Sequence, residues 1–145
     1  MQYNYDFEIA SLLIMTIILL HFVFVRQFPG EKTRVFGWLL FVCEAECLMN
    51  ILSCVGLANA ALVPQRLNEV LAFAFFVLEG ASSYLIYRYF MAACALRGRE
   101  RTVFAAAGMI PFAVFLVLVA VTPVTGFFYY FRDGSYYQGV CADYG

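Results

Sequence analysis

Residues 103–122, "VFAAAGMIPFAVFLVLVAVT", form a stretch of twenty positions without a charged side chain. A transmembrane helix needs about 20 predominantly apolar residues to cross a hydrocarbon core ~30 Å thick. An uninterrupted apolar run of this length is typical of a membrane span. The stretch therefore predicts a helix that crosses a lipid bilayer.

The composition of the whole chain supports the same class of protein. The 145 residues are 64% hydrophobic and 13% charged, whereas charged residues usually make up about 25% of a chain. The mean hydropathy is +0.82, and a soluble protein of this size could not bury so much apolar surface. We expect an integral membrane protein. The net charge of −1 and the lack of a basic stripe in the sequence argue against nucleic-acid binding.

Three further apolar runs accompany the first, at residues 8–27, 35–57 and 69–92. Backbone groups in lipid must be hydrogen-bonded within the segment, so each run is expected to be helical. Strands of a membrane barrel would be shorter and would alternate between apolar and polar residues. The sequence thus predicts an all-α bundle of four transmembrane helices within residues 1–122.

The basic residues predict the orientation of these helices. Six of the nine lysines and arginines lie in the two segments that join helices 1 to 2 and 3 to 4: Arg26, Lys32, Arg34, Arg97, Arg99 and Arg101. Short loops rich in Lys and Arg stay in the cytoplasm. We therefore expect the N-terminus and the C-terminus on the outer side.

Residues 123–145 are expected to form an outer segment rich in aromatic residues. Such side chains are enriched at the membrane–water interface, and the dipeptide Asp133–Gly134 is typical of a tight hairpin turn. We predict a short hairpin that pairs Phe127–Phe131 with Tyr136–Val140. Cys54 and Cys141 would both reach this side, where a disulfide is chemically allowed, but the sequence does not require that they pair.

Ionisable side chains inside membrane spans are functional candidates. Here they are His21, Glu44, Glu46, Glu79 and Arg88. Glu44 and Glu46 are separated by roughly 200° around a helix and must face different neighbours. For Glu44 two alternatives stay open: an ion pair with Arg88, or an interhelical hydrogen bond. Arg88 can also extend its head group to the cytoplasmic surface, and His21 is expected to be a hydrogen-bonded structural residue.

Glu46 and Glu79 are the strongest pair among these candidates. They lie about 16 and about 17 residues from the turn between helices 2 and 3, which places them at similar depth. Asn50 and Ser53 follow Glu46 on one face of helix 2, while Ser82 and Ser83 accompany Glu79 on helix 3. We expect the two polar patches to meet and their carboxyl groups to be protonated or to share a proton.

Three roles fit these polar groups: interhelical hydrogen bonds that only stabilise the fold, a signalling or proton-sensing site, or a transport path. Nucleophile elbows, phosphate loops and the spacing of metal ligands are missing from the sequence. We therefore expect neither catalytic residues nor a metal or cofactor, and the chain is not expected to be an enzyme by itself.

Five segments of the sequence resemble one family. They are "NYDFEIASLLIM" (4–15), "RQFPGEKTRVFGWLL" (26–40), "LMNILS" (48–53), "LNEVLAFAFFVLEG" (67–80) and "TPVTGFFYYFRDGSYYQG" (122–139). Together they resemble the N-terminal half of the multi-helix, seven-helix type of membrane sensor region that precedes diguanylate cyclase or histidine kinase domains in Firmicutes. Asn50 departs from the pattern, in which an acidic residue is expected at that position.

The resemblance implies the sensory input region of a bacterial signal-transduction protein in the cytoplasmic membrane. It also implies further helices and an output domain that are absent from these 145 residues, so that the chain looks truncated. The expected partners are the lipid bilayer, an unidentified small ligand, and either a second copy or the absent helices. The alternatives are a small proton or cation transporter that uses Glu46 and Glu79, and a purely structural membrane protein.

Overall fold

The computed structural model describes residues 6–25, 30–59, 62–94, 98–132 and 135–139. Its elements in chain order are α1 (Asp6–Val25), α2 (Glu31–Ala58), α3 (Gln65–Ala93), α4 (Gly98–Thr125), β1 (Tyr129–Arg132) and β2 (Ser135–Gln138). Each predicted apolar run forms one helix, and all four helices are long and apolar enough to cross a membrane. The predicted class, an all-α membrane protein with a terminal hairpin, is confirmed.

Three of the helices are longer than the apolar runs that predicted them. Helices α2, α3 and α4 contain 28, 29 and 28 residues. At a rise of ~1.5 Å per residue such helices measure about 42 Å, which exceeds the ~30 Å hydrocarbon core. The additional turns carry charged residues such as Glu31 and Arg101. The helices therefore continue into the head-group region, where charged side chains are hydrated.

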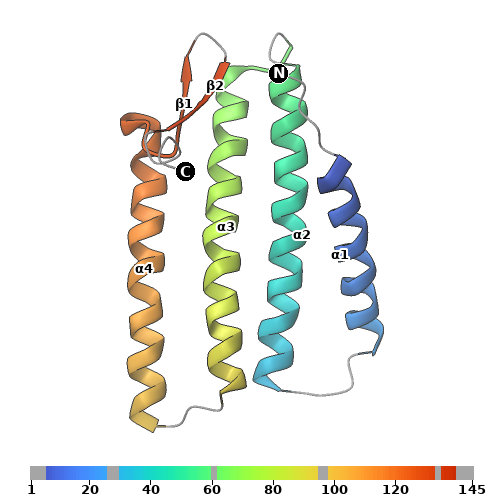
Figure 1. Cartoon of the computed structure of the whole chain (residues 1–145), viewed down its shortest axis with the longest axis vertical. Coiled ribbons are helices and arrows are strands. Elements are labelled where there is room, and N and C mark those ends of the chain that lie inside the picture. Colours follow the sequence, from blue (N-terminus) through green and yellow to red (C-terminus); the bar gives the residue numbers. More distant parts are fainter. Residues whose placement is uncertain (1–5, 26–29, 60–61, 95–97, 133–134, 140–145) are drawn as a thin grey trace.

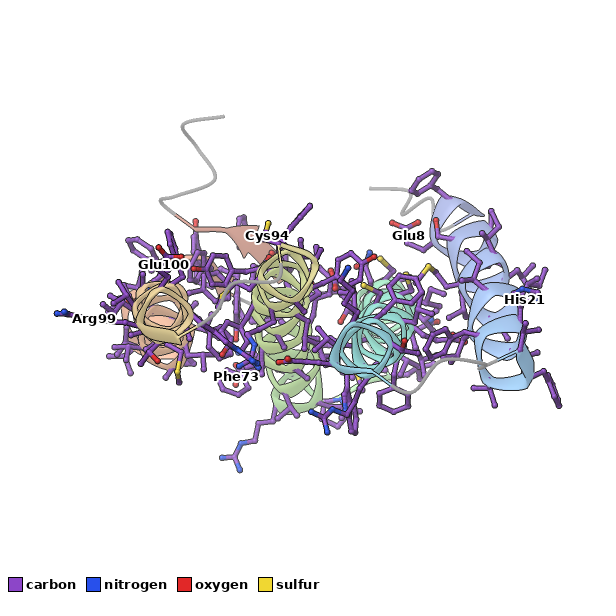
Figure 2. The ribbon with its side chains drawn as sticks, turned by 90° about the horizontal axis from the view of Figure 1, so that it is seen from below. Glu8, His21, Phe73, Cys94, Arg99 and Glu100 are labelled. Carbon is purple, nitrogen blue, oxygen red and sulfur yellow. The ribbon has the colours of Figure 1, made fainter. Side chains whose placement is uncertain are left out.

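The helices stand side by side in chain order and form a single row (Figures 1 and 2). Helix α2 packs most extensively against α3, while α1 packs on α2 and α4 packs on α3. Few apolar side chains in the described part are buried; they are Val35, Leu40, Ala72, Val119 and Tyr129. Because lipid tails are as apolar as a leucine side chain, the wide exposed faces of this row suit a bilayer.

A glycine lies at each interface between neighbouring helices. A Cβ atom at Gly37 of α2 would lie 2.8 Å from the ring of Phe22 of α1, and one at Gly80 of α3 would lie 2.7 Å from Phe115 of α4. Gly56 of α2 is similarly covered by the side chain of Asn68 of α3. Small residues allow helix backbones to approach closely in membranes, so these glycines determine how the row is packed.

The C-terminal strands form the predicted hairpin, with different bounds. Strands β1 and β2 are antiparallel, and Tyr130 is paired with Tyr137. The first strand begins at Tyr129 rather than Phe127, because Phe128 instead packs against Phe76 and Phe115, with ring centroids 5.3 and 5.4 Å away. Val140 and the turn residues Asp133 and Gly134 lie outside the described residues.

The hairpin is anchored on the helices by aromatic stacking. Tyr129 is 2% exposed, and its ring lies 5.4 Å from that of Phe76, at an interplanar angle of 9°. The hairpin lies at the end of the row where α4 ends and α3 begins (Figure 1). The basic ends of α2 and α4 lie at the opposite end, as the sequence predicts. Which end faces the cytoplasm stays a prediction, and Arg26 and Arg97 lie outside the described residues.

Candidate functional site

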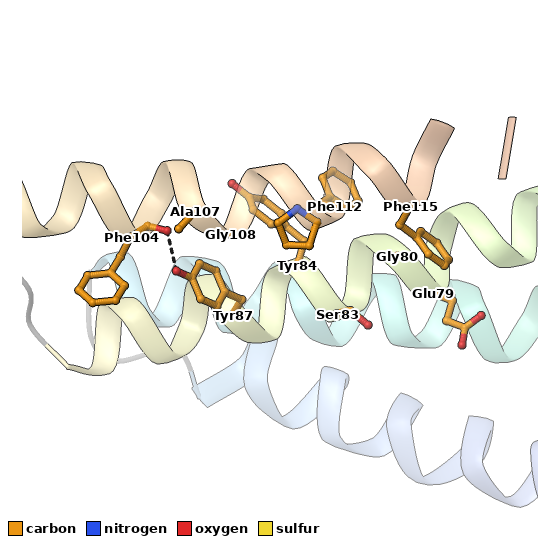
Figure 3. Close-up of a pocket in the computed structure, with 11 residues that line it drawn as sticks. Glu79, Gly80, Ser83, Tyr84, Tyr87, Phe104, Ala107, Gly108, Phe112 and Phe115 are labelled. Atoms are coloured by element: carbon orange, nitrogen blue, oxygen red, sulfur yellow. Dashed lines mark hydrogen bonds between the residues drawn. The ribbon is translucent and has the colours of Figure 1, made fainter. Parts of the chain in front are cut away.

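A cleft of about 550 Å³ separates α3 from α4 (Figure 3). Small residues on both helices make room for it: Gly80 on α3, and Ala107 and Gly108 on α4. Aromatic side chains bridge the same gap. The rings of Tyr84 and Phe112 stack with centroids 4.9 Å apart. The cleft is therefore an apolar space between two helices that are held apart by aromatic contacts.

The polar side chains of this cleft are few: the carboxyl group of Glu79 and the hydroxyl groups of Ser83, Tyr84 and Tyr87. Glu79 and Ser83 project from α3 and are exposed (Figure 3), and no described residue forms a hydrogen bond with the Glu79 carboxyl group. Pro111 has no backbone N–H, so the carbonyl of Ala107, four residues earlier, lacks its helical donor. Acceptors beside aromatic walls suit a molecule with an apolar body and a hydrogen-bond donor or cationic head.

The hydroxyl group of Tyr87 forms the hydrogen bond that crosses this cleft. It donates to the backbone carbonyl of Phe104, with an O···O distance of 2.5 Å (Figure 3). Both residues lie in the half of the cleft nearer the basic end of the molecule. A donor that reaches a neighbouring helix in this way fixes the local separation of α3 and α4 without closing the space between them.

Glu46 and Glu79 lie on the neighbouring helices α2 and α3. No hydrogen bond joins their carboxyl groups among the described residues, and their meeting stays a prediction. The wider patches do not merge as expected. The amide of Asn50 donates to Glu8 of α1 (Nδ2···Oε1 3.3 Å), and Ser82 donates within α3 to the Glu79 carbonyl, 2.9 Å away.

Glu44 contacts the opposite neighbour, α1. The hydroxyl oxygen of Thr16 lies 2.5 Å from Glu44 Oε1. Of the two alternatives for Glu44, the structure therefore shows the interhelical hydrogen bond and not the ion pair with Arg88. Glu44 thus faces α1, and the helix that Glu46 faces stays a prediction.

Arg88 belongs to a cluster of charges at the basic end of the row. Its guanidinium group lies 3.5 Å from Glu31 of α2 and donates to the hydroxyl group of Tyr84 at 3.4 Å. Glu31 also accepts a hydrogen bond from Arg101 of α4. This cluster connects α2, α3 and α4. Sequence reasoning missed Glu31, although an acidic residue in the first turn of α2, among three cations, was a usable signal.

The remaining predicted residues are not part of a shared site. His21 is exposed and points away from the other helices (Figure 2), with no hydrogen-bond partner in the described part of the chain. Among the described residues, no group of three or more His, Cys, Asp and Glu side chains is placed to hold a metal ion. Cys141 lies outside the described residues, so its pairing with Cys54 stays a prediction.

Comparisons with known proteins leave the family open. No protein-family model, curated protein or solved structure matches the chain. Its four long apolar helices make the chain a multi-pass membrane protein.

Proposed function

We propose that the chain is the membrane-embedded sensory region of a bacterial signal-transduction protein of the diguanylate cyclase or histidine kinase type. The cleft between α3 and α4 carries this proposal. It is large enough for a small molecule, it opens within the membrane-spanning part, and it lies between two helices that touch through a few aromatic contacts. The resemblance of the loops and the tail to sensor regions of Firmicutes supports the same role.

The proposed mechanism is a shift in the packing of α4 against α3. A molecule with an apolar body and a donor head would occupy the cleft and change the separation of the two helices. A ligand shifts a conformational equilibrium only when it binds the two states with different affinity. The cluster of Glu31, Arg88 and Arg101 would transmit the shift to the cytoplasmic end. In this proposal the residues described here supply no catalytic group, and a separate domain or partner produces the output.

A substitution that fills the cleft between α3 and α4 tests this function. In the bacterium that carries the gene, Ala107→Phe places a large ring in the cleft and should change cyclic diguanylate levels or histidine kinase phosphorylation by severalfold. Ala106→Phe is the matched control, because Ala106 is exposed on α4 and does not line the cleft. Equal output from wild type, both variants and a gene deletion, with equal membrane levels of the proteins, would contradict the proposal.

A second candidate function is proton or cation transport, which the two intramembrane carboxyl groups of Glu46 and Glu79, on neighbouring helices, favour. Reconstituted liposomes should then show proton or cation flux that disappears in Glu46→Gln and in Glu79→Gln. Glu100→Gln, an exposed position at the start of α4, serves as the control. Flux that is unchanged in both intramembrane variants rules out this path.

A further inference from the structure

A second, smaller cavity of about 200 Å³ lies at the outer end of the molecule, between α2, α3 and the hairpin. It is separate from the cleft between α3 and α4. Phe75 and Phe76 of α3 form one wall, and Phe131 and Tyr136 of the hairpin lie over it. Water occupies about 30 Å³ per molecule in the liquid, so the cavity has the volume of about six or seven waters, or of one small single-ring compound.

Two buried polar groups in this cavity have no hydrogen-bond partner among the described residues. Asn68 of α3 is 3% exposed, and its Oδ1 atom is buried beside Gly56 of α2, at the edge of the cavity, without a donor. The hydroxyl oxygen of Ser53 of α2 is buried and equally unpaired. Buried polar atoms are paired in the large majority of cases. Two unpaired groups from different helices, both lining one small cavity, indicate that something else completes their hydrogen bonds.

The chemistry of the walls defines what would fit. Among the described residues, no Lys, Arg or His side chain lines the cavity, so none of them would compensate the charge of an anion there. The carboxyl group of Glu8, on α1, already accepts a hydrogen bond from Asn50, which lines the cavity. The carboxamide group of Asn68 offers a hydrogen-bond donor beside an acceptor. The aromatic walls favour a flat ligand. These features match an uncharged planar molecule that presents its own donor beside an acceptor.

We propose that this outer cavity is a binding site for a small, neutral, planar molecule with an amide-like edge. Asn68 and Ser53 bind the polar edge, and the aromatic side chains of α3 and the hairpin enclose the ring. The proposal concerns binding alone and does not depend on the signalling role. A ligand bound here would contact α2, α3 and the hairpin together, and would stabilise the hairpin on the helices.

The probe is 4-fluorobenzamide, observed by ¹⁹F NMR with the full chain in lipid nanodiscs. Fluorobenzoate and fluorotoluene serve as comparison probes, because they keep the ring and change the edge to an anion or an apolar group. We expect saturable binding of the amide, at least tenfold tighter than binding of either comparison probe. Equal, non-saturable partition of all three compounds would show that the cavity holds only water, and would overturn the proposal.

Substitutions then locate the bound probe. Asn68→Leu should weaken binding of 4-fluorobenzamide at least tenfold, whereas Asn59→Leu, at the exposed end of α2, should leave it unchanged. If Asn68→Leu does not fold, Ser53→Ala decides, with an expected loss of about threefold to tenfold, the range of one neutral hydrogen bond. Unchanged affinity in Ser53→Ala and in any folded Asn68→Leu protein would place the probe elsewhere and contradict the assignment.

Discussion

Glu44 and Glu46 lie only two positions apart on α2 and point in different directions around the helix. Glu44 contacts Thr16 of α1. The hydroxyl oxygen of Thr16 lies 2.8 Å from the Leu12 carbonyl of its own helix and 2.5 Å from Glu44 Oε1. The Thr16 hydroxyl group thus donates across the interface of α1 and α2 to a carboxyl group that accepts the hydrogen bond.

This hydrogen bond predicts how substitutions of Glu44 change stability. Glu44→Gln keeps an acceptor for the Thr16 hydroxyl group and should leave the free energy of unfolding nearly unchanged. Glu44→Leu removes the hydrogen bond and should cost about 0.6 kcal/mol, the average for interhelical hydrogen bonds in a membrane. Unfolding by SDS in mixed micelles measures both values. A larger loss for Gln than for Leu would show that the hydrogen bond from Thr16 does not stabilise the interface of α1 and α2.

Among the elements, the hairpin packs on the helices through Tyr129, whose hydroxyl group is buried without a hydrogen-bond partner among the described residues. Burial raises the pKa of the Tyr129 phenol above its ordinary value, and the negative charge of Glu69 and the nearby Tyr136 raise it further. The folded protein therefore resists deprotonation of Tyr129 more than the unfolded protein does. This contribution to stability is fully present below the ordinary tyrosine pKa of about 10 and is lost as the pH rises through the higher folded value.

We therefore predict that the hairpin loosens above about pH 10. Proteolysis of residues 127–139 in nanodiscs, measured between pH 8 and pH 11, should accelerate at the upper end of this range. Tyr129→Phe removes the ionisable group and should flatten the profile. Tyr130→Phe, on the exposed face of β1, should keep the wild-type profile. A rise in proteolysis that is identical in all three proteins would exclude Tyr129 as its cause.

The helices could be predicted from the sequence because each depends on a local run of apolar residues. The similar depth of Glu46 and Glu79 was also predictable, because antiparallel neighbours pass equal numbers of residues from a shared turn. The partners of Asn50 and Glu44 were not, since they depend on how α1 is rotated against α2. Asn68 gave no signal at all: one asparagine near a helix start is typical of a hydrated interface, and its burial against Gly56 of α2 depends on how the two helices pack.

For the whole molecule, the single row of helices leaves two wide apolar faces and places two sets of groups at opposite ends. The hairpin lies at one end of the row, and the starts of α2 and α4 lie at the other (Figure 1). The smaller cavity lies beside the hairpin, and the cluster of Glu31, Arg88 and Arg101 lies at the opposite end. The proposed sensory function depends on which end faces the cytoplasm. A sensed molecule must reach the outer cavity or the cleft, and an output must be coupled to the basic end.

Accessibility of single cysteines to a membrane-impermeant thiol reagent tests this orientation most directly. Cys94 is exposed at the basic end of α3, and Tyr137→Cys places a thiol on the exposed face of β2. Each is studied with all other cysteines replaced by alanine. The account predicts that the reagent labels the thiol at position 137 in intact cells. The reagent should label Cys94 only after the membrane is permeabilised. Labelling of Cys94 in intact cells, with position 137 protected, would contradict the account.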